Sequence, residues 1–248
     1  MTIKTLLEPV KNPWESIDLS LDIKVAECDR AYLESLDLSK KQYRGLDLSL
    51  MPDPFCGNPH SWVYCLNMNP GEPGEIGRNF ETDERYIELI KRNLRHEVDS
   101  CFWSKDLLAN GKRHPGIDWM ERYLGPMKKK YGEYPNPFFI EYFPYHSKQG
   151  FNFPENLPSN QYRDYLIKKA MLEGKLIVVM RMARKGKKGW YDIEGLGLDL
   201  KSYSNLTELK NYRSVWVSKG NFKEDLLDSD IQKFFYHPIC QDSNQTKS

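Results

Sequence analysis

The sequence predicts an α/β fold in which a mostly parallel sheet of four short strands is sandwiched between helices. Two observations predict it. Short apolar runs are each stopped by turn-forming or polar residues, and segments with apolar residues at helical spacing separate them. The expected strands are residues 62–66, 138–143, 175–180 and 214–217. In such folds the carboxyl ends of the strands meet at one edge of the sheet, where ligands bind.

Length and composition allow one large domain or two small ones. The chain has 248 residues, of which 40% are hydrophobic, and this is enough to bury a core. No run approaches the roughly 18–20 apolar residues that span a bilayer, and the amino terminus lacks the apolar segment of a secretory signal. We therefore expect a cytoplasmic, monomeric protein without a membrane partner.

Charge and cysteine usage exclude several kinds of site. A net charge of +1 gives no overall attraction to nucleic acid, so a nucleic-acid partner would have to bind to the basic segments 105–130 and 181–188. The alternative is that both segments are ordinary solvated surface. The cysteines are widely spaced without a C-x-x-C pair, and no histidine has metal-ligand spacing. We expect reduced thiols and no metal or other cofactor. The cysteines are Cys28, Cys56, Cys65, Cys101 and Cys240.

Three regions are expected along the chain. Residues 1–50 form a partly helical lead-in that packs on the main domain, residues 51–240, and residues 241–248 form a disordered tail. The main domain opens with a loop rich in Pro, Gly and Asn, residues 51–60, which leads into the first strand.

The first strand ends in a loop that brings polar groups to the edge of the sheet. Residues 67–71 read Asn-Met-Asn-Pro-Gly. Because Pro70 follows it, Asn69 must be extended, and Gly71 allows main-chain N–H groups to approach a ligand closely. The alternative is a β-turn without chemistry.

Four helices are expected around the sheet. Thr82 caps the first, and the second lies within residues 117–127. The third follows Ser159 and ends before Gly174, and Gly174 itself is expected to have a left-handed conformation. Residues 225–235 form the fourth, closing helix.

Polar side chains follow every expected strand. The carboxyl ends of the strands would therefore collect them around one crevice. The residues expected there are Asn69, Tyr145, His146, Arg181 and Asn221.

The order of these motifs resembles the uracil-DNA glycosylase superfamily. Residues 67–71 are similar to the Gly-x-Asn-Pro-Gly motif of its single-strand-selective and mismatch-specific branches, and only Asn67 departs from it. Residues 138–144 resemble the family's second strand, with Glu141 where the family carries a base-reading Asn. The resemblance covers roughly residues 51–222, and it implies a three-layer α/β/α sandwich with a short, mostly parallel sheet.

Three shorter segments resemble an uncharacterised bacterial or phage group related to that superfamily. They are residues 52–55, 57–59 and 179–181. Within such a group the substrate can differ.

The resemblance implies roles for single residues. Asn69 would hold the water that attacks the sugar, the N–H groups around Gly71 would bind a base carbonyl or a phosphate, and Phe80 would stack on the base. A protonated His146 would donate to the leaving base, and Arg181 would bind a phosphate.

The other candidates have base- or phosphate-binding roles. Asn67, Met68 and Tyr145 would line the site, and Ser218, Lys219 and Asn221 would stand where the family's late motif meets a DNA groove. Ordinary alternatives stay open at this point: a core contact for Phe80, an ion pair for Glu141 or Arg181, and a plain turn at residues 218–221.

Three functions fit these features. The first is a DNA glycosylase that hydrolyses the N-glycosidic bond of uracil or another deaminated base, with single- or double-stranded DNA as its partner. The second is a non-catalytic nucleotide- or nucleic-acid-binding protein on the same fold. The third is an interaction protein whose crevice is vestigial.

Overall fold

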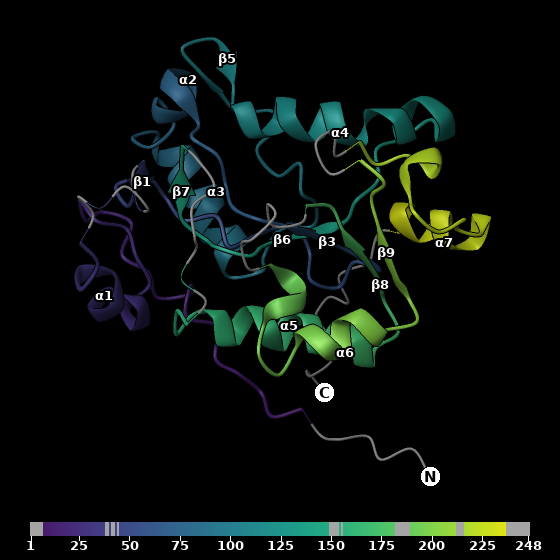
Figure 1. Cartoon of the computed structure of the whole chain (residues 1–248). Helices are drawn as coiled ribbons and strands as arrows, with labels where there is room; N and C mark the ends of the chain where they lie inside the picture. Colours follow the sequence, from purple (N-terminus) through teal and green to yellow (C-terminus); the bar gives the residue numbers. More distant parts are fainter. Residues whose placement is uncertain are drawn as a thin grey trace, which may run out of the picture.

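The protein has a mixed α/β fold with a five-stranded, mostly parallel sheet (Figure 1). The computed structural model describes residues 7–37, 40, 43, 45–148, 154, 156–181, 189–211 and 216–236. The sheet has the strand order β2-β6-β3-β8-β9, in which β2 is antiparallel and the other four are parallel. These strands are β2 (Phe55–Cys56), β3 (Val63–Asn67), β6 (Phe138–Glu141), β8 (Leu176–Val179) and β9 (Leu206–Glu208).

The sequence predicts three of the parallel strands correctly and the last one wrongly. The expected strands at residues 62–66, 138–143 and 175–180 are confirmed as β3, β6 and β8. The fourth parallel strand is β9 and not residues 214–217, of which 214 and 215 lie outside the described residues. Val217 donates its N–H to the carbonyl of Tyr123 at 2.9 Å and belongs to no strand. β9 escapes prediction because it has three residues and only one apolar side chain.

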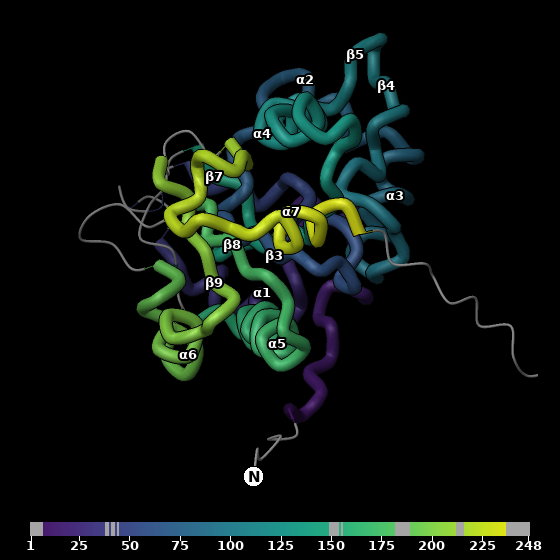
Figure 2. The backbone as a smooth tube through the Cα atoms, turned by 90° about the vertical axis from the view of Figure 1, so that its right-hand side faces the viewer, coloured from purple at the N-terminus to yellow at the C-terminus, as the bar shows by residue number. Residues whose placement is uncertain are grey.

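Both faces of the sheet are buried, which explains why its central strands are continuous apolar runs. Every residue of β3 and of β8 is buried. Tyr64 and Leu66 point into one hydrophobic cluster, and Val63 and Cys65 point into the other. The first cluster receives side chains from α1 (Glu27–Glu34), α3 (Glu84–Leu94), α5 (Asn160–Leu172) and α6 (Gly197–Ser202), and the second from α4 (Pro115–Tyr131) and α7 (Asp228–Gln232). Figures 1 and 2 show α4 and α5 on opposite sides of the sheet.

The four helices expected around the sheet correspond to α3, α4, α5 and α7, whereas α2 (Gly74–Arg78) and α6 were not expected. The helices are α1 (Glu27–Glu34), α2 (Gly74–Arg78), α3 (Glu84–Leu94), α4 (Pro115–Tyr131), α5 (Asn160–Leu172), α6 (Gly197–Ser202) and α7 (Asp228–Gln232). Short 3-10 turns are η2 (Trp190–Asp192), η3 (Lys219–Asn221) and η4 (Lys233–Phe235). Two small ladders complete the fold: β1 (Leu46–Asp47) with β7 (His146–Ser147), and β4 (Leu108–Ala109) with β5 (Lys112–Arg113). No described helix combines the length and apolar character needed to cross a membrane.

The helix caps differ from expectation in detail. Asp83, and not Thr82, caps α3 and accepts from the N–H of Arg85. Ser159 precedes α5 without capping it, because its hydroxyl donates to Asp29 instead. Gly174 has the expected left-handed conformation, with φ of +71°.

A buried polar network ties the amino-terminal region to the sheet domain. Asp29 of α1 is 0% exposed, and it accepts hydrogen bonds from the Tyr145 hydroxyl at 2.8 Å and the Ser159 hydroxyl at 2.6 Å. The Tyr145 oxygen also accepts from the N–H of Ala26 at 3.1 Å. These bonds hold α1 against the loops that follow β6 and precede α5. The tail expected at residues 241–248 lies outside the described residues.

The close approach of Gly197 to the turn before α6 gives a first prediction. A Cβ at this position would lie 2.3 Å from the Tyr191 carbonyl oxygen. We expect Gly197→Ala to lower the free energy of unfolding by about 1–3 kcal/mol, measured by urea denaturation. Gly125→Ala is the control, because nothing lies within 4 Å of that position in α4, and it should raise stability by about 0.5–1 kcal/mol. An unchanged midpoint for Gly197→Ala would contradict the close approach.

Candidate functional site

A cavity of about 540 Å³ lies at the carboxyl ends of β3, β6 and β8. The expected site residues on its wall are Asn67, Asn69, Gly71, Glu141, His146 and Arg181. The first turns of α4 form another wall. The parallel pairing of the three strands explains the meeting of these residues, because Asn67 and Glu141 are register partners and Arg181 follows the end of β8.

The Asn69 side chain is held in one orientation at the cavity wall. Its Nδ2 donates to the Pro70 carbonyl at 2.8 Å and to the Ser147 hydroxyl at 2.9 Å. Both amide hydrogens are therefore used, and Oδ1 is the group that remains for a ligand or a water. Asn69 thus presents a fixed hydrogen-bond acceptor.

His146 holds the loop after β3. Its Nδ1 lies 2.6 Å from the Gly71 carbonyl, which defines Nδ1 as the donor. Burial lowers the pKa of His146, and hydrogen bonds to the Gly71 and Met51 carbonyls oppose this shift. A neutral imidazole has a single N–H, and in His146 this N–H is directed at the Gly71 carbonyl. The expected donation from His146 to a leaving base has no free N–H in this structure.

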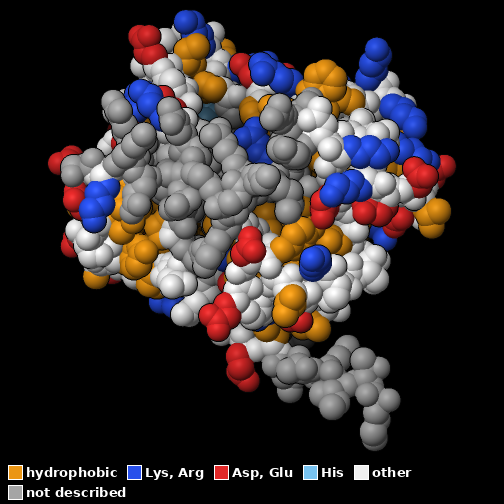
Figure 3. Space-filling model, in the orientation of Figure 1, with side chains coloured by type: hydrophobic (Ala, Val, Ile, Leu, Met, Phe, Trp, Pro, Cys, Tyr) orange, Lys and Arg blue, Asp and Glu red, His pale blue; other side chains and the backbone are white. Residues whose placement is uncertain are grey.

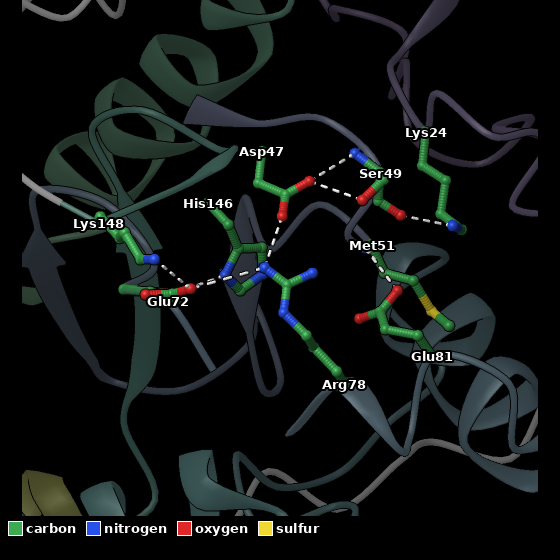
Figure 4. A network of polar contacts seen from close by, with 10 residues as sticks. Lys24, Asp47, Ser49, Met51, Glu72, Arg78, Glu81, His146 and Lys148 are labelled. Atoms are coloured by element: carbon green, nitrogen blue, oxygen red, sulfur yellow. Dashed lines mark hydrogen bonds and ion pairs between the residues drawn. The ribbon is translucent and has the colours of Figure 1, made fainter. Parts of the chain in front are cut away.

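The charges beside His146 neutralise one another. Figure 4 shows Arg78 next to the imidazole, directed toward two carboxylates. Arg78 pairs with Asp47 at 2.7 Å and with Glu72 at 3.6 Å, and Lys148 pairs with Glu72 at 3.2 Å. This network encloses a second cavity of about 130 Å³. Each basic group there already has an acidic partner.

Two aromatic residues expected at the site lie in the core instead. Phe80 is 0% exposed, and its ring packs against Tyr86 at 5.4 Å and His114 at 5.1 Å between centroids. The expected stacking role of Phe80 is therefore wrong, and the alternative as a core contact is correct. Tyr145 is also 0% exposed, and its hydroxyl is bound to Asp29, so its expected place in the crevice is wrong.

The expected late motif lies outside the cavity wall and forms an ordinary turn. The Ser218 carbonyl accepts from the Asn221 N–H at 2.9 Å, which closes η3. Lys219 pairs with Asp228 at 2.9 Å, and the Asn221 amide donates to the Trp216 carbonyl at 2.7 Å. None of these residues lines the cavity, and their expected contact with a DNA groove stays a prediction.

Met68 is also absent from the cavity wall. Its side chain packs against the first hydrophobic cluster, and its carbonyl accepts from the Phe143 N–H at 2.9 Å. Alternation along the strand explains this, because Asn67 and Asn69 point to the other side. The Met68 side chain therefore lies off the cavity wall, and its expected binding role stays a prediction.

Among the described Lys and Arg side chains of the two basic segments, Arg181 lines the cavity and those of residues 105–130 do not. Residues 182–188 of the second segment lie outside the described residues. In the first, Arg113 pairs with Asp118 at 2.7 Å and with Glu121 at 2.9 Å. Figure 3 shows Lys and Arg side chains gathered on the right of that view, where α4 ends with three lysines, residues 128–130.

A cluster of buried polar groups forms the base of the cavity. Burial raises the pKa of Glu141 well above its usual range, and the nearby Asp53 raises it further. Arg181 and a hydrogen bond from Asn67 oppose this shift. The positive charge of Arg181 thus lies near a buried acid, and its expected role in binding a phosphate stays a prediction. Burial also raises the pKa of Asp53 to about 7.

Asp53 gives a prediction on the pH dependence of stability. Its ordinary pKa is 3.8, so between about pH 4 and about pH 7 the unfolded chain releases a proton that the folded chain still holds. The free energy of unfolding therefore falls as the pH rises through that window. We expect Asp53→Asn to be more stable than the wild type, by at least about 1 kcal/mol more at about pH 8 than at about pH 5. Urea denaturation at both pH values measures this, and an equal gain at both would contradict it.

Sequence reasoning missed several residues of the cavity wall. Trp119 and Tyr123 of α4 are half-buried, with ring centroids 4.5 Å apart, and Trp119 lies 5.7 Å from the Phe139 ring. These three side chains line the cavity. His114 also lines it, and its Nδ1 caps α4 by accepting from the Gly116 N–H at 3.1 Å. Trp119 and Tyr123 lie four residues apart, so the sequence places both on one face of a helix. This spacing is compatible with a cavity wall, but it equally predicts a helix face that packs on the core.

Comparison with protein-family models, with curated proteins and with solved structures gives no match for this chain. In the part of the chain that the structure describes, no three His, Cys, Asp or Glu side chains are placed to hold a metal ion. What the protein does is therefore inferred from the cavity and its side chains.

Proposed function

We propose that this protein is a DNA base-excision glycosylase that hydrolyses the N-glycosidic bond of uracil or another deaminated base. In this proposal the fold is the three-layer α/β/α sandwich of the uracil-DNA glycosylase superfamily. Four parallel strands in the order β6-β3-β8-β9, with helices against both faces, support it. The antiparallel β2 is an addition at the edge.

The observation that carries the proposal is the fixed Oδ1 of Asn69 at the cavity. Glycosidic cleavage develops positive charge on the sugar, and a water must then add at the anomeric carbon. Oδ1 accepts a hydrogen from this water and leaves its lone pair directed at the sugar. An amide takes no proton as a general base would, so its contribution is orientation and electrostatic preorganisation.

The aromatic wall and the size of the cavity fit a flipped base. Trp119, Tyr123 and Phe139 supply the stacking surface that Phe80 does not. A volume of about 540 Å³ lies in the ordinary range for small-molecule sites. The target base would leave the DNA stack to reach this wall.

The leaving base is stabilised by groups other than His146. The base departs with the bonding electrons, so it needs hydrogen-bond donors on its edge. Arg181 and a neutral Glu141 carboxyl are the donors at the base of the cavity. The positive charge of Arg181 favours the anionic product.

One observation favours a non-catalytic base- or nucleic-acid-binding protein on the same fold. Burial lowers the pKa of His146, and the single N–H of the neutral ring is directed at the Gly71 carbonyl, so the expected acid for the leaving base is already engaged. Such a protein would bind bases or oligonucleotides saturably without releasing a base from DNA.

An alkaline-cleavage assay separates the two functions. End-labelled single- and double-stranded oligonucleotides carrying uracil, hypoxanthine or xanthine are incubated with the full chain and then heated in alkali. The glycosylase proposal predicts cleavage at the modified position in at least one substrate. Binding without any abasic product, from folded protein, favours the second function.

A further inference from the structure

The Asp53 carboxyl on the cavity wall has no partner of opposite charge. It is half-buried, and among the described residues it has no ion pair and no side-chain hydrogen bond. The titratable groups near it are those of Glu141, Cys56 and Tyr86. All three are acids, and burial raises the pKa of each, so none supplies a positive charge. Nothing described therefore balances the Asp53 carboxylate when it is ionised.

The other charged groups on the cavity wall have partners. Glu72 pairs with Lys148 at 3.2 Å. Arg181 opposes the rise in the pKa of Glu141, so these two groups lie close enough to balance each other. The two histidines of the wall are neutral near pH 7, because burial lowers the pKa of both. Among the described residues that line the cavity, Asp53 is thus the charge that stays unmatched.

The aromatic wall of the cavity lies within electrostatic reach of this carboxyl. Phe139 is the register partner of Cys56, and Asp53 raises the pKa of the Cys56 thiol. The Trp119 ring centroid lies 5.7 Å from that of Phe139 and 4.5 Å from that of Tyr123. A cation over an aromatic face is attracted by the electrons of the ring. A carboxylate and aromatic rings in one cavity therefore favour a flat cation.

Asn67 adds an unpaired acceptor to the same cavity. Its side chain is 3% exposed and lines the cavity, and Oδ1 has no hydrogen-bond partner among the described residues. Buried polar atoms are nearly always paired, so this atom points to a ligand with an N–H group. The unsatisfied groups thus favour a ligand that is both cationic and a hydrogen-bond donor.

A positively charged base also needs no acid at His146. A purine that is alkylated on a ring nitrogen carries a positive charge on its ring. When its C1′–N bond breaks, the bonding electrons pass to the ring nitrogen and cancel that charge, so the base leaves as a neutral molecule. The water oxygen bonds to C1′ and releases one proton to the solvent. The single N–H of His146 can therefore stay on the Gly71 carbonyl.

We propose that the cavity takes a positively charged, ring-alkylated purine, with Asp53 as its counter-charge and Trp119, Tyr123 and Phe139 as its stacking wall. The inference rests on the proposed function in placing a DNA base in this cavity, and it goes beyond it by adding alkylated bases to the ligands. Asp53 then selects a charged base over a neutral base of the same shape.

Titration calorimetry of the full chain with a matched pair of free bases tests the inference. 7,9-Dimethyladeninium carries a fixed positive charge, and 8,9-dimethyladenine is a neutral base with the same number of heavy atoms. At about pH 8 and low salt we expect the cation to bind at least about tenfold more tightly than the neutral base. Equal affinities, or no binding of the cation by the folded chain, would overturn the inference.

The preference is expected to depend on pH, because burial raises the pKa of Asp53 to about 7. At about pH 6 the carboxyl holds a proton that the bound cation must displace. The affinity for the cation should therefore fall about tenfold from about pH 8 to about pH 6, with the neutral base within about threefold. An equal change for both bases would contradict the role of Asp53.

Asp53→Asn separates the charge from the shape of the site. The variant keeps the size of the side chain, and we expect it to bind the two bases with affinities within about threefold of each other. Asp22→Asn is the matched control, because it removes an exposed carboxyl outside the cavity wall and should keep the preference. A preference that survives in Asp53→Asn, with thermal unfolding showing a folded protein, would overturn the inference.

The outcome is distinguishable from a failure of the proposed function. A preference for the cation without release of any base from DNA would leave the inference standing and remove the glycosylase. Release of uracil from DNA without this preference would leave the glycosylase standing and remove the inference.

Discussion

Asn69→Ala is expected to lower the single-turnover rate of base release at least about 100-fold, with the fold unchanged. The variant removes Oδ1, which is the fixed acceptor at the cavity, together with the two hydrogen bonds of Nδ2. A 100-fold loss corresponds to about 2.7 kcal/mol of transition-state stabilisation. Binding of the oligonucleotide should change much less, because the acceptor contacts the water and not the DNA. Rates at saturating protein measure this effect.

Ser147→Ala is the matched control for Asn69. It removes one of the two acceptors that hold the Nδ2 group and keeps Oδ1 in place. We expect a smaller loss, of about tenfold, because the amide is held less firmly. A rate for Asn69→Ala within about threefold of the wild type would contradict the water-orienting role.

Asp29→Ala is expected to lower the free energy of unfolding by about 3–5 kcal/mol. The carboxyl of Asp29 is fully buried and accepts from the Tyr145 hydroxyl and from both the N–H and the hydroxyl of Ser159. Alanine would leave these three donors unpaired inside the protein. Urea denaturation measures the loss, and the slope of the transition shows whether the fold stays cooperative.

Two further variants control the Asp29 prediction. Asp22→Ala changes an exposed carboxyl of the same region and should alter stability by less than about 0.5 kcal/mol. Tyr145→Phe removes one of the donors and should cost about 1–3 kcal/mol. A loss below about 1 kcal/mol for Asp29→Ala would contradict the importance of this network.

The strands that the sequence predicts correctly are those buried on both faces. β3 and β8 are continuous apolar runs because helices cover both sides, and this pattern is read directly from the chain. β9 and β2 are edge strands of three and two residues, whose pairing depends on a neighbour already in place. Residues 216–217 carry apolar side chains for a different reason, since Val217 is buried against the second hydrophobic cluster.

The site is predictable where it depends on the ends of strands. Asn69, Glu141 and Arg181 meet because parallel strands end together. Phe80 and Tyr145 were misplaced because the sequence does not show which aromatic ring is covered by the core. Asp53 lines the cavity because the loop that carries it is held beside β6 by the next residues, which form the antiparallel edge strand β2. The sequence does not predict a strand as short as β2, so Asp53 was missed.

The glycosylase proposal requires that this cavity release a base from DNA. Mass spectrometry can identify the products from a uracil-containing oligonucleotide incubated with the full chain. We expect free uracil and an abasic strand in equal amounts, and both should be lost in Asn69→Ala. Intact oligonucleotide and no free base, with wild-type protein that is folded and binds the oligonucleotide, would contradict the proposal.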